Sequence, residues 1–358
     1  MVSVKVRLRQ GASCAHVAIR ICPLVSVIAS QKSGKGYAVS RVERAQDKLS
    51  HMKQNRAILI AGPTASGKSA LALAIAKSCG GTIINADSMQ VYAELRILTA
   101  RPMPADEEIA PHRLYGHVSV TQNYSVATWL EDVDAAIRDV RAVGRTPIII
   151  GGTGLYFMAL TRGLSPVPAI PDEIRRYWRQ VACERPAQEL YQELRRRDPI
   201  TAAQLRESDR QRIVRAIEVY EATGTPLAHW QEKPGTPLLL PEEYVGLVVD
   251  LPRADLYARA DARFAQMISE GALEEATLMR AMQLNADLPA TRALGLGPLM
   301  ACVAGEISLE EASEVTCRDT RHYIRRQLTW LRRNMIAWKW IQTKRMEQIK
   351  RSGFSFVD

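Results

Sequence analysis

The segment AILIAGPTASGKSALAL, residues 57–73, constrains the fold of this chain more than any other feature. An apolar run leads into a loop bounded by glycines, and a second apolar run follows. Residues 62–69 match the pattern G-x-x-x-x-G-K-[ST] in full. Between a strand and a helix, this pattern turns backbone amides inward on an anion, and the helix N-terminus adds partial positive charge. The segment therefore predicts a buried strand, a phosphate-binding loop and a helix.

The phosphate loop supplies the first predicted site residues. Lys68 is expected to neutralise phosphate oxygens, and the hydroxyl of Ser69 is the candidate ligand for Mg²⁺. The alternative is a glycine turn capped by a serine. Taken alone, the motif favours an ATP-dependent kinase, with Asp250 as the magnesium carboxylate. The predicted diphosphate- or nucleotide-binding residues are Gly62, Pro63, Thr64, Ala65, Ser66, Gly67, Lys68 and Ser69.

Strand and helix patterns alternate after residue 56. Alternation of this kind is typical of an α/β fold with a parallel sheet, which binds ligands at the carboxyl ends of its strands. Helices are predicted from Gly67 to about Lys77 and over 125–144. Strands are predicted at 57–61, 82–86, 115–120 and 146–152.

The prolines of residues 163–171 mark a boundary, after which the strand patterns stop. Residues 172–224 are helical in pattern and rich in arginine, and 244–252 predicts a returning strand. We therefore predict a P-loop NTPase-like parallel sheet core that contains an inserted all-helical domain. The predicted core is 52–164 with 244–358 and C-terminal helices, and the predicted insertion is 165–243.

The formal net charge of +10 is concentrated at the N-terminus. Residues 1–51 carry nine lysines and arginines against two acids, so this segment has a net charge of +7 and the rest +3. A transit peptide and a mis-started, non-functional extension are equally consistent with the segment, and we expect poor order in either case. Any argument for a nucleic-acid partner therefore depends on local basic clusters.

The composition also limits where in the cell the protein is expected to be found. The apolar stretches are interrupted well before the roughly 20 residues that a membrane span needs, so we expect no membrane association. The six cysteines are scattered without C-x-x-C spacing, which favours reduced thiols and no structural zinc. We expect a cytoplasmic protein, or a mitochondrial one if residues 1–51 are a transit peptide.

Asp87 directly follows the predicted strand 82–86. The carboxyl ends of parallel strands share one edge of the sheet, so Asp87 should face the same crevice as the phosphate loop. A carboxylate there can bind magnesium or accept a proton from an incoming nucleophile. The alternative is that Asp87 caps the segment that follows it.

Four motifs together resemble the tRNA dimethylallyltransferases, in particular the bacterial type. They are GPTASGKS at 62–69, DSMQVY at 87–92, TARP at 99–102 and GGTGLY at 151–156. The resemblance continues through 209–227 and 320–333 and covers roughly 56–341. It implies transfer of a dimethylallyl group from dimethylallyl diphosphate to the exocyclic N6 amine of the adenine 3′ to the tRNA anticodon. Diphosphate then leaves from the loop, and no phosphoryl group is transferred.

The resemblance also implies roles for individual residues. Asp87 would take or orient the amine proton, while Thr153 and Arg175 would join Lys68 at the diphosphate. The adenine must be extruded from its stacked loop to expose its amine. The residues implied to contact tRNA are Asp87, Ser88, Met89, Gln90, Gln211, Arg212, Ile213, Val214 and Arg215.

A second basic cluster lies near the C-terminus. Four arginines recur at nearly helical spacing beside an apolar stripe, which predicts an amphipathic helix with a basic face. Such a face is either solvated or binds RNA backbone. The arginines are Arg318, Arg321, Arg325 and Arg332, and the stripe is Ile324, Leu328, Leu331 and Met335.

Two stretches depart from the family pattern. Arg101 stands where a lysine is usual in the family. The family's R-x-x-G-Y, followed by a basic and an acidic residue, appears here as RALGLGP at 292–298, so an aromatic and a charge are missing. The second departure weakens the expectation that 292–298 contacts RNA. The alternatives to a tRNA-modifying enzyme are an adenylate isopentenyltransferase, a small-molecule kinase and a nucleotide-binding switch without chemistry. We expect a monomer that requires Mg²⁺.

Overall fold

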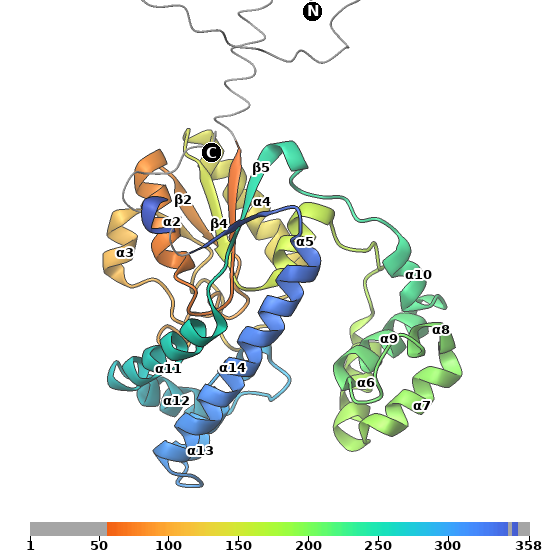
Figure 1. Ribbon diagram of the computed structural model, residues 1–358. Coiled ribbons are helices and arrows are strands. Elements are labelled where there is room, and N and C mark those ends of the chain that lie inside the picture. The colour runs from red at the N-terminus through yellow and green to blue at the C-terminus, as the bar shows by residue number, and fades with distance from the viewer. Residues whose placement is uncertain (1–55, 343–345, 350–358) are drawn as a thin grey trace, which may run out of the picture. The chain divides into compact units, whose positions relative to one another are not determined.

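The computed structural model describes residues 56–342 and 346–349, and its centre is a parallel sheet (Figure 1). The strand order is β3-β2-β4-β1-β5-β6, and all neighbouring strands run parallel. This confirms the predicted α/β class. The strands are β1 (Ala57–Ala61), β2 (Thr82–Asn85), β3 (His112–Arg113), β4 (Pro147–Gly151), β5 (Tyr244–Val249) and β6 (Lys339–Ile341).

Helices and loops connect the strands. The helices that follow the first four strands are α2 (Lys68–Cys79), α3 (Pro104–Ile109), α4 (Val126–Ala142) and α5 (Gly154–Arg162). The inserted helices are α6 (Asp172–Glu184), α7 (Ala187–Arg197), α8 (Pro199–Ala202), α9 (Arg210–Thr223) and α10 (Leu227–Glu232). The C-terminal helices are α11 (Arg253–Ser269), α12 (Ala272–Ala281), α13 (Leu296–Val303) and α14 (Leu309–Asn334), and short 3₁₀ turns are η2 (Pro241–Glu243) and η3 (Pro289–Arg292).

The central strands are buried on both faces, as their continuous apolar runs require. Ile58 and Ile60 of β1 pack toward Leu71 of α2 and toward α11 and α14. Leu59 points to the opposite face and joins Trp129 of α4 in a second cluster. Figure 1 shows α2 and α4 on opposite sides of the sheet. Because β2, β4 and β1 are neighbouring parallel strands in this helix-covered sheet, their carboxyl ends lie side by side.

The inserted helices α6–α10 have a hydrophobic cluster of their own. Trp178 of α6, Leu194 of α7 and Ile217 of α9 are among its buried members. The segments that enter and leave the insertion pass very close to each other. A Cβ added to Gly163 would lie 2.4 Å from the backbone nitrogen of Thr236, so glycine is needed at this crossing.

One predicted strand is absent from the structure, and one observed strand was not predicted. Residues 115–120 do not form the third strand, because Leu114 and Gly116 adopt positive φ angles of 62° and 55° and turn the chain after β3. Only an isolated bridge between Tyr92 and Val118 remains there. The edge strand β6 was missed, because its three residues are too few to give a periodic signal.

Within residues 56–342 and 346–349, no helix is long and apolar enough to cross a membrane. The predicted extension of residues 1–51 lies outside the described residues, so its order and function stay predictions.

Candidate active site

The phosphate loop joins β1 to α2 in the predicted strand–loop–helix arrangement. Gly67 is the N-cap of α2 and has a φ of 83°, which a residue with a side chain rarely adopts. A Cβ on Gly62 would lie 2.9 Å from the Ser66 hydroxyl and 3.2 Å from the Val249 Cβ. The first turn of α2 also leaves backbone N–H groups without intrahelical acceptors. The glycines therefore allow a turn that presents free amides to an anion.

Lys68 lies half-buried in this loop, and its Nζ donates to the Pro63 carbonyl at 3.3 Å. Burial lowers the pKa of Lys68 to about 8. The carboxylate of Asp87 raises this pKa, and the guanidinium of Arg263 lowers it further. A bound anion would favour the charged amine. Lys68 is thus placed to respond to a negatively charged ligand.

Asp87 follows β2 and lies next to the phosphate loop, as predicted. Its Oδ1 accepts a hydrogen bond from the backbone N–H of Met89 at 3.0 Å, so it also caps the segment that follows. Its backbone N–H donates to Oδ1 of Asn85 at 2.8 Å. The GGTG motif at residues 151–154 forms a second glycine loop. A Cβ built on Gly152 would lie 3.6 Å from Oδ2 of Asp87, so that oxygen faces the second glycine loop. Capping with Oδ1 leaves Oδ2 for other chemistry.

Thr153 occupies the N-cap position of α5, but its hydroxyl does not cap the helix. The hydroxyl oxygen accepts a hydrogen bond from the backbone N–H of Ser88 at 3.0 Å and lies 3.3 Å from the Ser88 hydroxyl. Thr153 therefore ties the second glycine loop to the segment that carries Asp87.

Glycine is required at positions of the second glycine loop because other segments pack closely against its backbone. A Cβ on Gly151 would lie 1.9 Å from the carbonyl oxygen of Ala86, and one on Gly154 would lie 2.2 Å from the ring of Trp330. The GGTG motif therefore allows β2 and α14 to pack directly on this loop.

Arg263 of α11 is a site residue that the sequence analysis missed. Its Nη2 donates to the Thr64 hydroxyl, and its charge acts on both Lys68 and Asp87. No local motif marks Arg263, because its partner lies 199 positions away in the sequence. With Lys68, it places two cations against one carboxylate beside the phosphate loop.

A cavity of about 260 Å³ opens beside these groups. Its polar lining includes Thr64, Asp87, Ser88, Arg263, Arg292 and Arg326. Its apolar lining includes Met89, Leu98, Phe264 and Met267. Such a lining suits a ligand with an anionic head and a short hydrocarbon chain.

Two of the predicted site residues, Ser69 and Gln90, line a different and smaller cavity. The Gln90 side-chain amide donates to the carbonyls of Thr99 and Ala100 at 2.8 and 2.9 Å. Its N–H groups therefore hold the TARP segment. Arg101, the departure from the family lysine, donates to the carbonyls of Tyr92 and Ala93 at 2.9 Å. Its role in this structure is to brace the loop.

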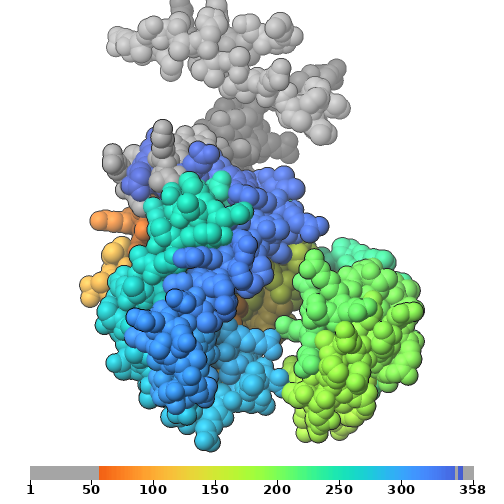
Figure 2. Space-filling view, turned by 60° about the horizontal axis from the view of Figure 1, so that its bottom comes forward, coloured from red at the N-terminus to blue at the C-terminus, as the bar shows by residue number. Residues whose placement is uncertain are grey.

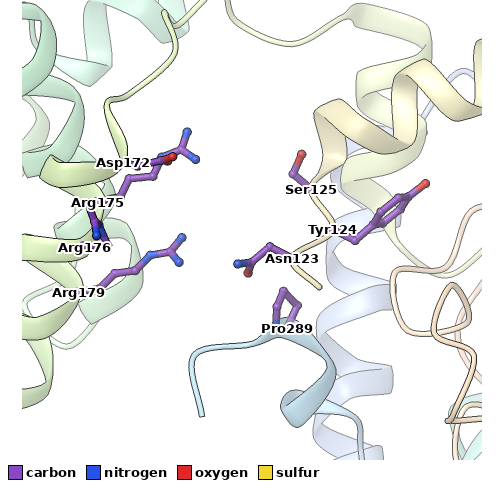
Figure 3. A pocket seen from close by; sticks show the side chains of 8 residues that line it. All are labelled: Asn123, Tyr124, Ser125, Asp172, Arg175, Arg176, Arg179 and Pro289. Carbon is purple, nitrogen blue, oxygen red and sulfur yellow. The ribbon is translucent and has the colours of Figure 1, made fainter. Parts of the chain in front are cut away.

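Arg175 is not brought together with Thr153 and Asp87. It lines a separate cavity of about 690 Å³ with Arg176 and Arg179 of α6. Figure 3 shows these arginines facing Asn123, Tyr124 and Pro289 across the cavity. The hollow is visible in Figure 2 between the green helices of 172–232 and the blue C-terminal helices. Three arginines and one aspartate, Asp172, line it, so the cavity is suited to a large anionic ligand.

The second predicted contact segment needs a correction. Ile213 and Val214 are buried in the core of the inserted helices, at 0% and 8% exposure, so their side chains stabilise that core. Gln211 and Arg212 at the start of α9 are exposed. Arg212 pairs with Asp209 at 3.5 Å, and Arg215 pairs with Glu218 at 3.5 Å. Of the five residues, only Gln211, Arg212 and Arg215 have side chains accessible to a ligand.

The predicted amphipathic helix is α14, and Ile324, Leu328 and Leu331 form its buried stripe, which Met335 continues just beyond the helix. Its basic face is partly neutralised, because Arg321 pairs with Asp261 and Arg318 with Asp319.

In the divergent stretch 292–298, Arg292 lines the 260 Å³ cavity and Leu296 is buried.

Fold and site together define an α/β P-loop enzyme that handles a phosphorylated ligand. The chain belongs to the IPP transferase family, whose model matches residues 90–334. A model of isopentenyl transferases matches residues 55–117.

Known proteins similar to this chain agree with that assignment. The tRNA dimethylallyltransferase of Rhodopseudomonas palustris is 51% identical over 292 residues, which cover 82% of this chain and 91% of the relative. That of Parvibaculum lavamentivorans is 49% identical over 304 residues, covering 85% and 96%. The structure of the tRNA isopentenylpyrophosphate transferase of Bacillus halodurans matches with a TM-score of 0.58 at 29% identity, covering 83% of this chain and 95% of that one. A eukaryotic dimethylallyltransferase shares the fold, with a TM-score of 0.70 at 24% identity and coverage of 82% and 75%.

Proposed function

We propose that this protein is a tRNA dimethylallyltransferase. It transfers the dimethylallyl group of dimethylallyl diphosphate to the N6 amine of the adenine 3′ to the anticodon, and diphosphate leaves. The observation that carries the proposal is one cavity in which Thr64 of the phosphate loop and Arg263 meet Asp87 and an apolar wall. The charge of Lys68 interacts with both Asp87 and Arg263. That lining matches a short prenyl chain with a diphosphate head and an amine acceptor.

The reaction breaks the bond between the allylic carbon and the diphosphate oxygen, and it forms a bond from that carbon to the adenine nitrogen. Negative charge builds on the departing diphosphate. Loop amides, Lys68 and Arg263 stabilise that charge from fixed positions. The nitrogen loses one proton, which Asp87 accepts or orients. Thr153 acts through Ser88 to hold the Asp87 segment in place.

Magnesium fits this site as a partner of the substrate. Within residues 56–342 and 346–349, no cluster of three or more acidic, histidine or cysteine side chains could hold a metal. Mg²⁺ commonly binds through one or two protein oxygens together with substrate phosphates and water. The exposed hydroxyl of Ser69 on the first turn of α2 is suited to that role. When bound, the ion would neutralise charge on the leaving group.

The tRNA is proposed to lie along the hollow lined by α6, with the predicted insertion 165–243 against its anticodon stem-loop. Arg175, Arg176 and Arg179 are suited to phosphate contacts. Arg212 and Arg215 extend the same kind of surface on α9. Ser88 and Met89 line the cavity that would receive the extruded adenine. We propose a cytoplasmic enzyme, and its monomeric state stays a prediction.

A direct assay separates this function from its rivals. The purified protein is incubated with dimethylallyl diphosphate, Mg²⁺ and either an unmodified anticodon stem-loop or AMP, and the products are identified by mass spectrometry. We expect prenylated adenine in the stem-loop and no reaction with AMP. Prenylation of AMP alone would assign the protein to adenylate isopentenyltransferases instead.

A further inference from the structure

Gln327 of α14 is a buried polar side chain that the reaction above does not use. It lies on the apolar side of the helix beside Leu328 and is 7% exposed. Its Oε1 accepts a hydrogen bond from the backbone N–H of Thr64 at 2.9 Å. Its Nε2 donates to the carbonyl of Gly152 at 3.1 Å. One side chain thus joins the phosphate loop to the second glycine loop.

The space between the two loops fits this side chain closely. A Cβ added to Gly152 would lie 2.4 Å from the Nε2 of Gln327. Thr64 is held from a second direction, because its hydroxyl accepts a hydrogen bond from Arg263. Interiors packed this tightly transmit small displacements. A change at Gln327 should therefore move the loops relative to each other.

The loops that Gln327 joins carry the two halves of the reaction. The phosphate loop holds the diphosphate, and the second glycine loop carries Thr153, which fixes the segment of Asp87. Alignment of donor and acceptor depends strongly on position, since a displacement near 1 Å costs about 100-fold in rate. The partly buried N–H of Thr64 also loses its acceptor when Gln327 is replaced.

We propose that Gln327 is a positioning residue that fixes the phosphate loop against the loop of Thr153, and so sets both diphosphate affinity and donor–acceptor alignment. The inference rests on the proposed function. Gln327 acts through Thr64 and Gly152 and does not contact substrate. This role accounts for a single buried amide in a helix whose outer face is basic.

The first test replaces Gln327 with a side chain of similar length that forms no hydrogen bonds. In Gln327→Met we expect the dissociation constant of inorganic pyrophosphate with Mg²⁺ to rise about tenfold, the effect of losing the hydrogen bond that holds Thr64. The KM for dimethylallyl diphosphate should rise with it and kcat should fall. Binding of the tRNA stem-loop should stay within about twofold, because it uses other surfaces. Calorimetry measures both affinities without turnover.

The control is Thr329→Ala on the exposed side of the same helix. The Thr329 hydroxyl bonds only to the Arg325 carbonyl one turn earlier. This variant should keep the wild-type pyrophosphate affinity. If the wild-type protein binds pyrophosphate but transfers no prenyl group, the proposed function fails. The effect of Gln327 on pyrophosphate affinity can still be measured in that case.

A second variant gives a signature that a purely structural role would not produce. In Gln327→Glu the protonated carboxyl can accept from Thr64 N–H and donate to the Gly152 carbonyl, whereas the ionised form cannot donate. The pyrophosphate affinity of this variant, relative to wild type, should therefore recover as pH falls. Burial raises the pKa of such a carboxyl. The charged and titratable groups of the surrounding elements are Asp87, Lys68, Arg263, Tyr323 and Arg326. They are present in both proteins, so the ratio to wild type isolates the effect of the introduced carboxyl.

Two results would overturn the proposal. One is a folded Gln327→Met variant whose pyrophosphate affinity and KM match wild type. The other is a pH-independent ratio for Gln327→Glu, which also decides the matter if the methionine variant does not fold.

Discussion

The phosphate end of the sheet and the inserted helices hold their charges in opposite ways. In the first region Thr64 is tied to Arg263 and Gln327 across 199 and 263 positions of sequence. In the second, Arg212 pairs with Asp209 one turn away and keeps 74% of its side chain exposed. Chemistry at a leaving group needs preorganised charge, while binding a polyanion needs charge more than fixed geometry. Substitutions in the two regions should therefore affect different quantities.

The largest effect is expected at Asp87. Asp87→Asn keeps an oxygen for the Met89 amide but removes the proton acceptor. We expect kcat to fall by about 10² to 10⁴, with tRNA affinity nearly unchanged. Single-turnover prenylation with saturating donor measures this. A loss confined to tRNA affinity would contradict the assignment of Asp87 to the chemical step.

Arg263→Lys should have the next largest effect. The charge remains, but the planar fork that reaches Thr64 is lost. We expect the KM for dimethylallyl diphosphate to rise about tenfold, with kcat falling as well. Steady-state kinetics with varied donor measures both. Arg253→Lys on the same helix is the matched control, because Arg253 is exposed at the start of α11. Equal effects at both positions would remove the special role of Arg263.

Lys68 predicts a pH dependence of donor binding. Its pKa of about 8 in the free protein means that the amine loses its charge as pH rises through 8. A bound diphosphate favours the charged form, so donor affinity should be constant from pH 7 to 8. It should then weaken by up to about tenfold per pH unit. In Lys68→Arg this dependence should vanish, and a wild-type affinity that stays flat up to pH 10 would refute the assignment.

The smallest effect is expected in the inserted helices. Arg212→Ala should weaken tRNA binding by a few-fold and reduce the slope of log K against log salt by about one. The kcat at saturating tRNA should not change. Binding measured at several salt concentrations checks this. An unchanged slope would mean that Arg212 contacts no phosphate.

The sequence predicted the parts of this fold that local patterns encode. The runs that form β1, β2, β4 and β5 are continuous and apolar, and glycine, proline or a polar residue ends each. The segment 115–120, YGHVSV, contains strand-forming residues such as Val118 and Val120, but positive φ angles at residues 114 and 116 turn it out of the sheet.

The sequence predicted those site residues that lie within recognisable motifs. Lys68, Asp87 and Thr153 lie in motifs, and the structure brings them together. Arg263 and Gln327 lie in helices whose local pattern shows only amphipathicity, so only the packing of distant segments reveals them. Burial of Ile213 beside exposed Arg212 likewise depends on the face that α9 presents to its neighbours.

The central claim is that the phosphate loop stabilises departing diphosphate and transfers no phosphoryl group. It is tested by mixing the protein with Mg²⁺, ATP, dimethylallyl diphosphate and an unmodified anticodon stem-loop, and by quantifying all products together. The account predicts one diphosphate released for each prenylated adenine, with ATP left intact. Consumption of ATP with a phosphorylated product, while the prenyl donor remains untouched, would contradict it.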